Sequence, residues 1–175
     1  MLFDSTSLKE LQLDNRVGLA PMTRVSATED GRATDRMARY YAKFAEGGFS
    51  FLVTEGVYTD SAYSKGYLNQ PGLVTPNQVD AWSTVVDAVH DAGAPIFAQL
   101  MHCGAQNQGI PPSEPQETIA PSAVRPKGEK SEAYGGSGAY PVPEEATRKD
   151  LEAAREGFVA AAENAAGGGE AATER

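Results

Sequence analysis

The stretch FAQLMHCG, residues 97–104, begins as an apolar run and ends in polar side chains. Together with Pro95 and Ile96 it predicts a buried strand over 95–100. Gln99 and His102 fall near the end of that strand. Either these polar residues mark the ordinary end of a strand that meets water, or they line a site at its tip. The rest of the chain decides between these two interpretations.

Two earlier stretches have the same character. RVGLAP (16–21) is a short apolar run stopped by Pro21, and FSFLVTEG (49–56) is an apolar run that ends in polar residues and glycine. Apolar runs of this length, bounded by Pro, Gly and polar residues, are typical of buried parallel strands. We therefore predict three strands.

A helix signal follows each predicted strand. Thr34 is a candidate N-cap after the first strand, and Thr75 with Pro76 and Gln78 forms a capping box with proline in the first turn after the second. Thr147 and Asp150 begin a helix after the third strand. The expected apolar faces of the three helices are Met37, Tyr40, Tyr41, Phe44 and Ala45; Val79, Trp82, Val85, Val86 and Val89; and Leu151, Ala154, Phe158, Ala161 and Ala165.

Strands that alternate with helices predict parallel pairing and an α/β fold. A doubly wound sheet and a (β/α)₈ barrel both satisfy this pattern. The first strand-to-helix turn, APMTRVSATEDG (20–31), has no G-x-G-x-x-G, and the chain has no P-loop, which weakens the nucleotide-binding doubly wound option. The connection 103–146, rich in Gly, Pro, Ser and Glu, is too long for an ordinary loop and suggests a functional or disordered segment.

Composition narrows the class of protein. The 175 residues carry a formal charge of −9, which argues against nucleic acid and anionic membranes as partners. No stretch is long enough to span a bilayer, the first residues do not resemble a signal peptide, and a single cysteine excludes an internal disulfide. We therefore expect a cytoplasmic protein. Cys103 follows a histidine, but no base-orienting partner lies nearby in sequence, so we interpret it as a small apolar residue rather than a nucleophile.

In either α/β architecture the carboxyl ends of the strands form the functional face. Three groups of residues fall there: 20–24, 54–56 and 99–104. Gln99 and His102 thus lie where a barrel enzyme places its working groups.

Four motifs along the chain resemble those of a known protein family. NRVGLAPMTR (15–24), YYAKFAEGGFSFLVTEG (40–56), SKGYLNQPGLVTPNQVDAW (64–82) and FAQLMHCG (97–104) closely resemble the Old Yellow Enzyme family of FMN-dependent ene-reductases and NAD(P)H:flavin oxidoreductases. The resemblance extends from about residue 2 to about residue 166, in order and at the family's spacing. It implies a (β/α)₈ TIM barrel with FMN across the strand tips.

The resemblance also implies roles for individual residues. Pro21, Met22 and Thr23 would border the isoalloxazine ring, and the Thr23 hydroxyl would tune its potential. Gly56 would let the ring approach the backbone closely. Gln99 would bond the pyrimidine edge of the flavin, because an amide offers both a donor and an acceptor. Gln99 is also the strongest candidate, since a buried amide without partners costs roughly 1–3 kcal/mol.

Three further positions are assigned from the same motifs. Tyr67 matches a tyrosine that reaches the substrate side of the flavin. His102 is not the family's catalytic histidine, and structural support is its expected role. Met101 stands where many relatives have an aromatic residue, so their substrate specificity does not transfer. No metal ligand and no catalytic residue is expected in this chain.

The end of the chain departs from the family. The helix passes through FVAAAENAA (158–166) and the sequence then becomes GGGEAATER (167–175), an atypical tail of the kind that a shifted reading frame of GC-rich DNA produces. We expect about the first three strand-helix units of the barrel, which needs about 250 residues in full. The substrate-anchoring His with Asn or His, the proton-donor Tyr and the usual FMN phosphate site lie beyond this part. The chain is expected to form the amino-terminal portion, 1–175, of a single FMN-binding TIM-barrel domain.

Two functions follow as expectations. The first is an FMN-dependent NAD(P)H oxidoreductase that reduces activated alkenes (enones) by hydride transfer through the flavin, in a truncated chain that is inactive alone. The second is a non-catalytic remnant or interaction fragment that pairs with a separate carboxyl-terminal half. A small-molecule substrate and a homo-oligomer, or that complementing half, are the expected partners. An unrelated small α/β binding domain is disfavoured by four motifs in register.

Overall fold

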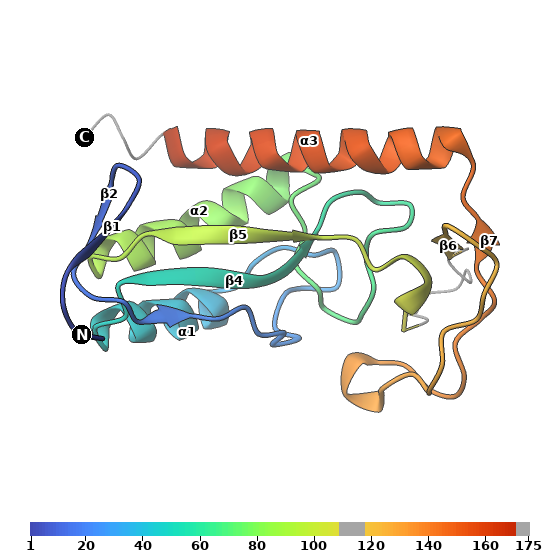
Figure 1. Ribbon diagram of the computed structural model, residues 1–175, viewed down its shortest axis with the longest axis horizontal. Helices are drawn as coiled ribbons and strands as arrows, with labels where there is room; N and C mark the ends of the chain where they lie inside the picture. Colours follow the sequence, from blue (N-terminus) through green and yellow to red (C-terminus); the bar gives the residue numbers. More distant parts are fainter. Residues whose placement is uncertain (109–117, 171–175) are drawn as a thin grey trace.

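A computed structural model describes residues 1–108 and 118–170 of the chain. Its centre is a parallel sheet of three strands in the order β3-β4-β5 (Figure 1). The strands are β3 (Gly18–Leu19), β4 (Phe51–Tyr58) and β5 (Ile96–Met101). All three predicted strands are confirmed, and β3 and β5 lie at the edges of the sheet.

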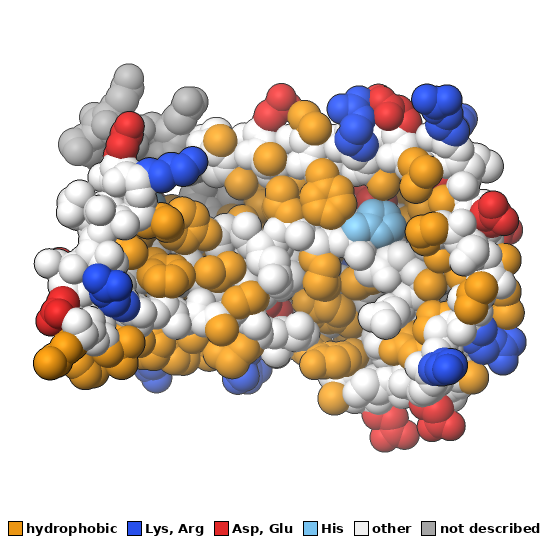
Figure 2. Space-filling model, viewed as in Figure 1, with side chains coloured by type: hydrophobic (Ala, Val, Ile, Leu, Met, Phe, Trp, Pro, Cys, Tyr) orange, Lys and Arg blue, Asp and Glu red, His pale blue; other side chains and the backbone are white. Residues whose placement is uncertain are grey.

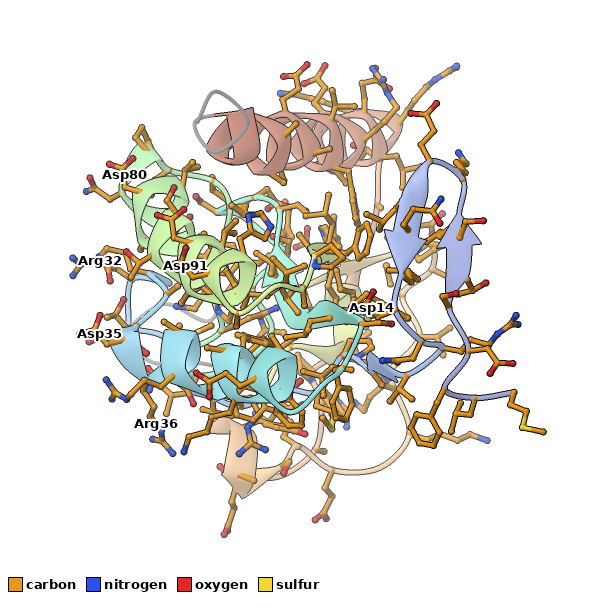
Figure 3. The ribbon with its side chains drawn as sticks, turned by 90° about the vertical axis from the view of Figure 1, so that its left-hand side faces the viewer. Asp14, Arg32, Asp35, Arg36, Asp80 and Asp91 are labelled. Atoms are coloured by element: carbon orange, nitrogen blue, oxygen red, sulfur yellow. The ribbon has the colours of Figure 1, made fainter. Side chains whose placement is uncertain are left out.

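Two helices cover one face of this sheet, α1 (Asp35–Glu46) and α2 (Pro76–Asp91) (Figure 3). The labelled charges at their amino ends, Asp35, Arg36 and Asp80, point away from the sheet (Figure 3). The apolar faces of the helices pack on the strands, as predicted. The most deeply buried side chains of this core are Met37, Tyr41, Leu52, Val57, Val85 and Val89.

The predicted helix starts are confirmed by their hydrogen bonds. Thr34 accepts from the backbone amide of Met37, and Thr75 forms a capping box with Gln78. The third helix, α3 (Arg148–Glu170), begins after Thr147, whose hydroxyl accepts from the Asp150 amide while the Asp150 carboxylate accepts from the Thr147 amide. Each cap satisfies amides of the first turn that have no partner within the helix.

The third helix continues through Glu170, past the expected break after Ala166, while 171–175 of the predicted tail lie outside the described residues. A partial barrel leaves its helices without some of their neighbours, so part of their apolar faces is expected to stay exposed. Leu151 and Phe158 of α3 are 55% and 37% exposed, which confirms this expectation, while Ala161 is buried. For Trp82 of α2 the expectation was wrong: the indole is buried and donates to the Gly72 carbonyl.

One hydrogen bond fixes the far half of α3. The side-chain amide of Asn164 donates to the backbone carbonyl of Leu73, 2.8 Å away and 91 residues earlier in the chain. A pocket of about 80 Å³ between α2, α3 and the sheet lies beside this contact, lined mainly by apolar side chains such as Val79 and Ile96. This hydrogen bond thus fixes α3 to the segment that leads into α2.

The long connection after β5 is structured where it is described. It contains η1 (Gly104–Gln106), β6 (Ile119–Ala120), η2 (Glu132–Tyr134) and β7 (Glu144–Glu145), with β6 and β7 paired in parallel. The side chain of Gln108 stabilises this connection: its oxygen accepts from the backbone amide of Ser131, and its NH₂ group donates to the Tyr140 hydroxyl. Residues 109–117 of the predicted 103–146 segment lie outside the described residues.

The sequence analysis missed a short hairpin at the start of the chain. It consists of β1 (Thr6–Leu8) and β2 (Leu11–Leu13), an antiparallel pair. Lys9 provides the turn with φ of +53°, a role more often taken by Gly or Asn, so the usual hairpin signal is absent from the sequence. Across the described ranges, no helix is both long enough and apolar enough to cross a bilayer.

Candidate functional site

A β-bulge in β4 shapes the carboxyl end of the sheet. Val53 pairs with Phe97, but the next pair is Gly56 with Gln99, so β4 carries one extra residue. The Thr54 hydroxyl fills the gap, accepting from the Gln99 amide at 3.0 Å and donating to the Glu55 carbonyl at 2.8 Å. Bulges re-aim side chains near functional sites. Here the neighbour of Thr54, Glu55, reaches the segment that follows β3, because its Oε2 accepts from the Arg24 amide.

Three of the predicted site residues come together beside this bulge. The Gly56 carbonyl accepts from the Tyr67 hydroxyl and from the side-chain amide of Gln70, each at 3.1 Å. The Thr23 side chain lies near enough to the Tyr67 hydroxyl to oppose part of the rise in its pKa. Thr23, Gly56 and Tyr67 therefore form one connected group, and strand pairing places Gln99 next to Gly56.

Gln99 has a different environment from the one expected. Its side chain is exposed and has no hydrogen-bond partner among the described residues, so the premise of a buried amide was wrong. The reason is that β5 is an edge strand and that no helix covers this face of the sheet (Figure 1). An exposed amide retains a free donor and a free acceptor for a ligand. Its role at a flavin stays a prediction.

Pro21 and Met22 lie on the segment between β3 and α1, and both are exposed. They offer apolar surface beside Thr23. On the face that Figure 2 shows, further apolar side chains gather over the strands below α3. Phe97 of β5 is also exposed. Contact of Pro21 and Met22 with a flavin ring stays a prediction.

The absence of a side chain at Gly56 makes room for Met101. A Cβ placed on Gly56 would lie 2.7 Å from both the sulfur and the terminal methyl carbon of Met101. The thioether therefore occupies the space above this glycine, at the position where many relatives carry an aromatic ring. Methionine is unbranched and adaptable, so it can yield to a ligand more easily than a ring can.

Tyr67 is held as a neutral phenol. It is 6% exposed, and burial raises its pKa well above the usual range. Its ring lies 5.6 Å from that of Tyr134, at an interplanar angle of 42°. The connection after β5 thus closes over Tyr67, which retains its proton for the bond to Gly56.

His102 has partners on both sides of its ring. Nδ1 accepts from the Gly104 amide at 3.1 Å, and Nε2 lies 3.5 Å from Oδ2 of Asp60. Burial lowers the pKa of His102, an effect that the nearby Asp60 carboxylate opposes. Asp60 in turn accepts from the amides of Ala62 and Tyr63 through Oδ1. These contacts join the ends of β4 and β5 and fit the structural role expected for His102.

Cys103 packs against Gly66. A Cβ at Gly66 would lie only 1.9 Å from the Cys103 sulfur, so the thiol fills the space that the glycine leaves. Burial raises the pKa of Cys103 to about 11. A thiol with this pKa is almost fully protonated at neutral pH, which agrees with its interpretation as an apolar residue.

This environment predicts slow modification of Cys103. At pH 8 a pKa near 11 rather than 9 reduces the thiolate fraction, and with it the alkylation rate, about 100-fold. Iodoacetamide labelling followed by mass spectrometry measures the rate, with the chain in urea as the control for an exposed thiol. Equal rates in the two conditions would contradict the buried position.

The donor set fits the ring of a flavin. Thr23 provides a hydroxyl, Gln99 an amide with both a donor and an acceptor, and Pro21 and Met22 provide apolar surface. The cation next to Thr23 is Arg24, whose guanidinium lies 4.8 Å from the centre of the Tyr40 ring. Within 1–108 and 118–170, no group of three His, Cys, Asp or Glu side chains could hold a metal ion.

Comparison with known proteins gives the family. The model of the NADH:flavin oxidoreductase / NADH oxidase family matches residues 1–171. A probable flavin mononucleotide-dependent alkene reductase of Leishmania infantum is 31% identical over 161 residues, which are 90% of this chain and 43% of that protein. A chanoclavine-I aldehyde reductase of Penicillium roqueforti is 39% identical over 103 residues, 59% of this chain and 28% of that protein.

Comparison with solved structures leads to the same family. The Old Yellow Enzyme homologue of Zymomonas mobilis has a TM-score of 0.84 at 31% identity, over 96% of this chain and 46% of that one. Morphinone reductase in complex with tetrahydroNAD has a TM-score of 0.84 at 29% identity, over 96% and 47%. The chain spans about half the length of these proteins, which agrees with a partial (β/α)₈ barrel. From its motifs, its fold and the match over 1–171, the chain belongs to the NADH:flavin oxidoreductase / NADH oxidase family.

Proposed function

We propose that this chain forms the ring-contacting part of an FMN-dependent NAD(P)H oxidoreductase that reduces activated alkenes. The observation that carries the proposal is the connected group of Thr23, Gly56 and Tyr67, with the free amide of Gln99 beside it. The group lies at the carboxyl ends of parallel strands, where barrel enzymes place their sites. The relatives named for flavin and alkene reduction support the choice of cofactor and substrate class.

When bound, FMN would supply the hydride transfer that links oxidation of NAD(P)H to reduction of an activated alkene. In this proposal the chain's own residues bind and orient. Gln99 donates to and accepts from the pyrimidine edge, and Thr23 offers its hydroxyl to the ring. Tyr67 holds Thr23 and the Gly56 carbonyl in place and borders the substrate side. The groups that anchor the substrate and donate the proton come from a part of the barrel beyond these three strands.

A second candidate is a non-catalytic fragment that pairs with a separate carboxyl-terminal half. It is favoured by the open edge of β5 and by the exposed apolar side chains of α3. An open strand edge with an apolar face offers a pairing surface to another chain. This candidate needs the same partner as the first but no flavin.

Co-expression with the carboxyl-terminal half of the Zymomonas mobilis relative tests both candidates. We expect a yellow complex that oxidises NADH or NADPH only when an enone such as 2-cyclohexenone is present, while the chain alone stays inactive. In the complex, Gln99→Ala is expected to lower flavin affinity roughly 10-fold, because the pyrimidine edge loses its hydrogen bonds. Glu46→Gln, on the exposed surface of α1, is the matched control.

The outcomes separate the two functions. A complex that forms without flavin favours the interaction fragment. A yellow complex with no alkene-dependent oxidation of NAD(P)H contradicts the proposed reaction. Alkene reduction by the chain alone would contradict the need for a second half.

A further inference from the structure

Glu55 is the buried charge that the proposed function leaves unused. Its side chain is fully buried, and its Oε1 has no hydrogen-bond partner among the described residues. Oε2 accepts from the Arg24 amide at 3.0 Å, and the nearby Val25 amide also favours the charged carboxylate. Both amides belong to the segment that follows Thr23.

That segment is strained at Val25. Its φ is +52°, in the left-handed region that a β-branched side chain rarely adopts. Strained backbone of this kind persists only where its surroundings hold it, and it gathers at functional sites. The Arg24 amide, which the Glu55 carboxylate binds, directly precedes this strained residue.

We propose that Glu55 is a positioning residue: its buried carboxylate binds the Arg24 amide and so holds the strained turn at Val25, which presents the Thr23 hydroxyl to Tyr67. The β4 bulge aims the carboxylate at this turn, and the Tyr41 hydroxyl fixes the bulge by accepting from the Glu55 amide at 2.9 Å. Only the consequence for a flavin rests on the proposed function. The interaction of Glu55 with the turn involves only residues of this chain.

Stability alone gives a poor account of this carboxylate. Burial raises the pKa of Glu55, which means that the surroundings disfavour the charged form. One oxygen without a partner adds to that cost, and an apolar side chain of similar size would avoid it. A buried charge that disfavours folding, yet holds a strained turn at a candidate site, is better explained by positioning.

Hydrogen–deuterium exchange of the full chain tests whether Glu55 holds this turn in place. Glu55→Leu is expected to raise exchange of a peptide covering 23–26 roughly 10-fold or more, since the Arg24 amide loses its acceptor and the strained turn is released. Glu55→Gln keeps an acceptor oxygen and is expected to restore most of the protection. Leu52→Ala, in the same strand, is the control for general destabilisation and is expected to raise exchange throughout the core.

Cysteine labelling tests the consequence for position 23. In a Thr23→Cys, Cys103→Ser chain, Glu55→Leu is expected to speed alkylation at position 23 several-fold, and Glu55→Gln to leave it nearly unchanged. Adding Val25→Gly to the Glu55→Leu chain is expected to slow labelling again, because glycine adopts this φ without strain.

The proposal is overturned if Glu55→Leu changes neither readout, or if it raises exchange everywhere as Leu52→Ala does. Neither readout involves flavin. If the exchange and labelling patterns hold but the complex with a carboxyl-terminal half takes up no FMN, the proposed function fails while the role of Glu55 stands.

Discussion

The purified chain, mixed with excess FMN and passed over a desalting column, is expected to emerge colourless. Thr23, Gly56 and Gln99 provide contacts to the ring only, while the family's phosphate site follows the seventh and eighth strands of a barrel. Each missing charge-assisted hydrogen bond forgoes roughly 1.5–3 kcal/mol. Since about 1.4 kcal/mol corresponds to tenfold in affinity, two or three missing bonds weaken binding by factors of hundreds or more.

Quenching of FMN fluorescence during titration measures this affinity. Riboflavin is the matched control, because it has the ring and the ribityl chain but no phosphate. The chain is expected to bind FMN and riboflavin equally weakly. Submicromolar FMN binding that riboflavin does not share would show a phosphate site within the 175 residues and would contradict this prediction.

The second large effect concerns association. On size-exclusion chromatography the chain is expected to elute as oligomers or aggregates, with a broad urea transition. The edge strands β3 and β5 are open, and Phe97, Leu151 and Phe158 are between 37% and 55% exposed. Leaving roughly 300 Å² of apolar surface unburied forgoes about 7 kcal/mol, a large part of the about 5–15 kcal/mol that stabilises a domain.

A double variant locates this surface. Leu151 and Phe158 are seven residues apart and share one face of α3, so Leu151→Gln with Phe158→Gln is expected to reduce association. Val124→Gln, at an apolar residue in the connection after β5 that is 68% exposed, is the control and is expected to change little. A monodisperse monomer with a single sharp urea transition would show that the chain is an autonomous domain.

The strands and helices were predictable because local signals agree with packing. The capping box at Thr75 and the apolar face through Val85 and Val89 both formed as the sequence indicated. The exposure of Gln99 was harder to predict, because an apolar strand face is buried only where a neighbour covers it. Hydrophobic periodicity identifies the apolar face of a strand or helix, but it does not show whether another element covers that face.

For the site, the sequence identified the strand ends but not the way they connect. Thr23, Gly56 and Tyr67 were named through a family resemblance, and the structure added the hydrogen bond from Tyr67 to Gly56 and the nearness of Thr23 to Tyr67. Glu55 was placed only within the group 54–56. Its role depends on an extra residue in β4 and on the left-handed Val25, and neither feature leaves a signal in the sequence. A glutamate within an apolar strand was the available hint.

The bond from Asn164 to Leu73 also sets an order of events during synthesis. The two residues are 91 positions apart. At about 5–20 residues per second, Asn164 leaves the ribosome roughly 5–18 s after Leu73. Once Met101 has also emerged, the three strands, α1 and α2 are all outside the exit tunnel. For the remaining roughly 3–13 s before Asn164 follows, the side of α2 that α3 later covers faces water. The nascent chain therefore offers a chaperone an apolar surface for several seconds, until the last turns of α3 emerge and cover it.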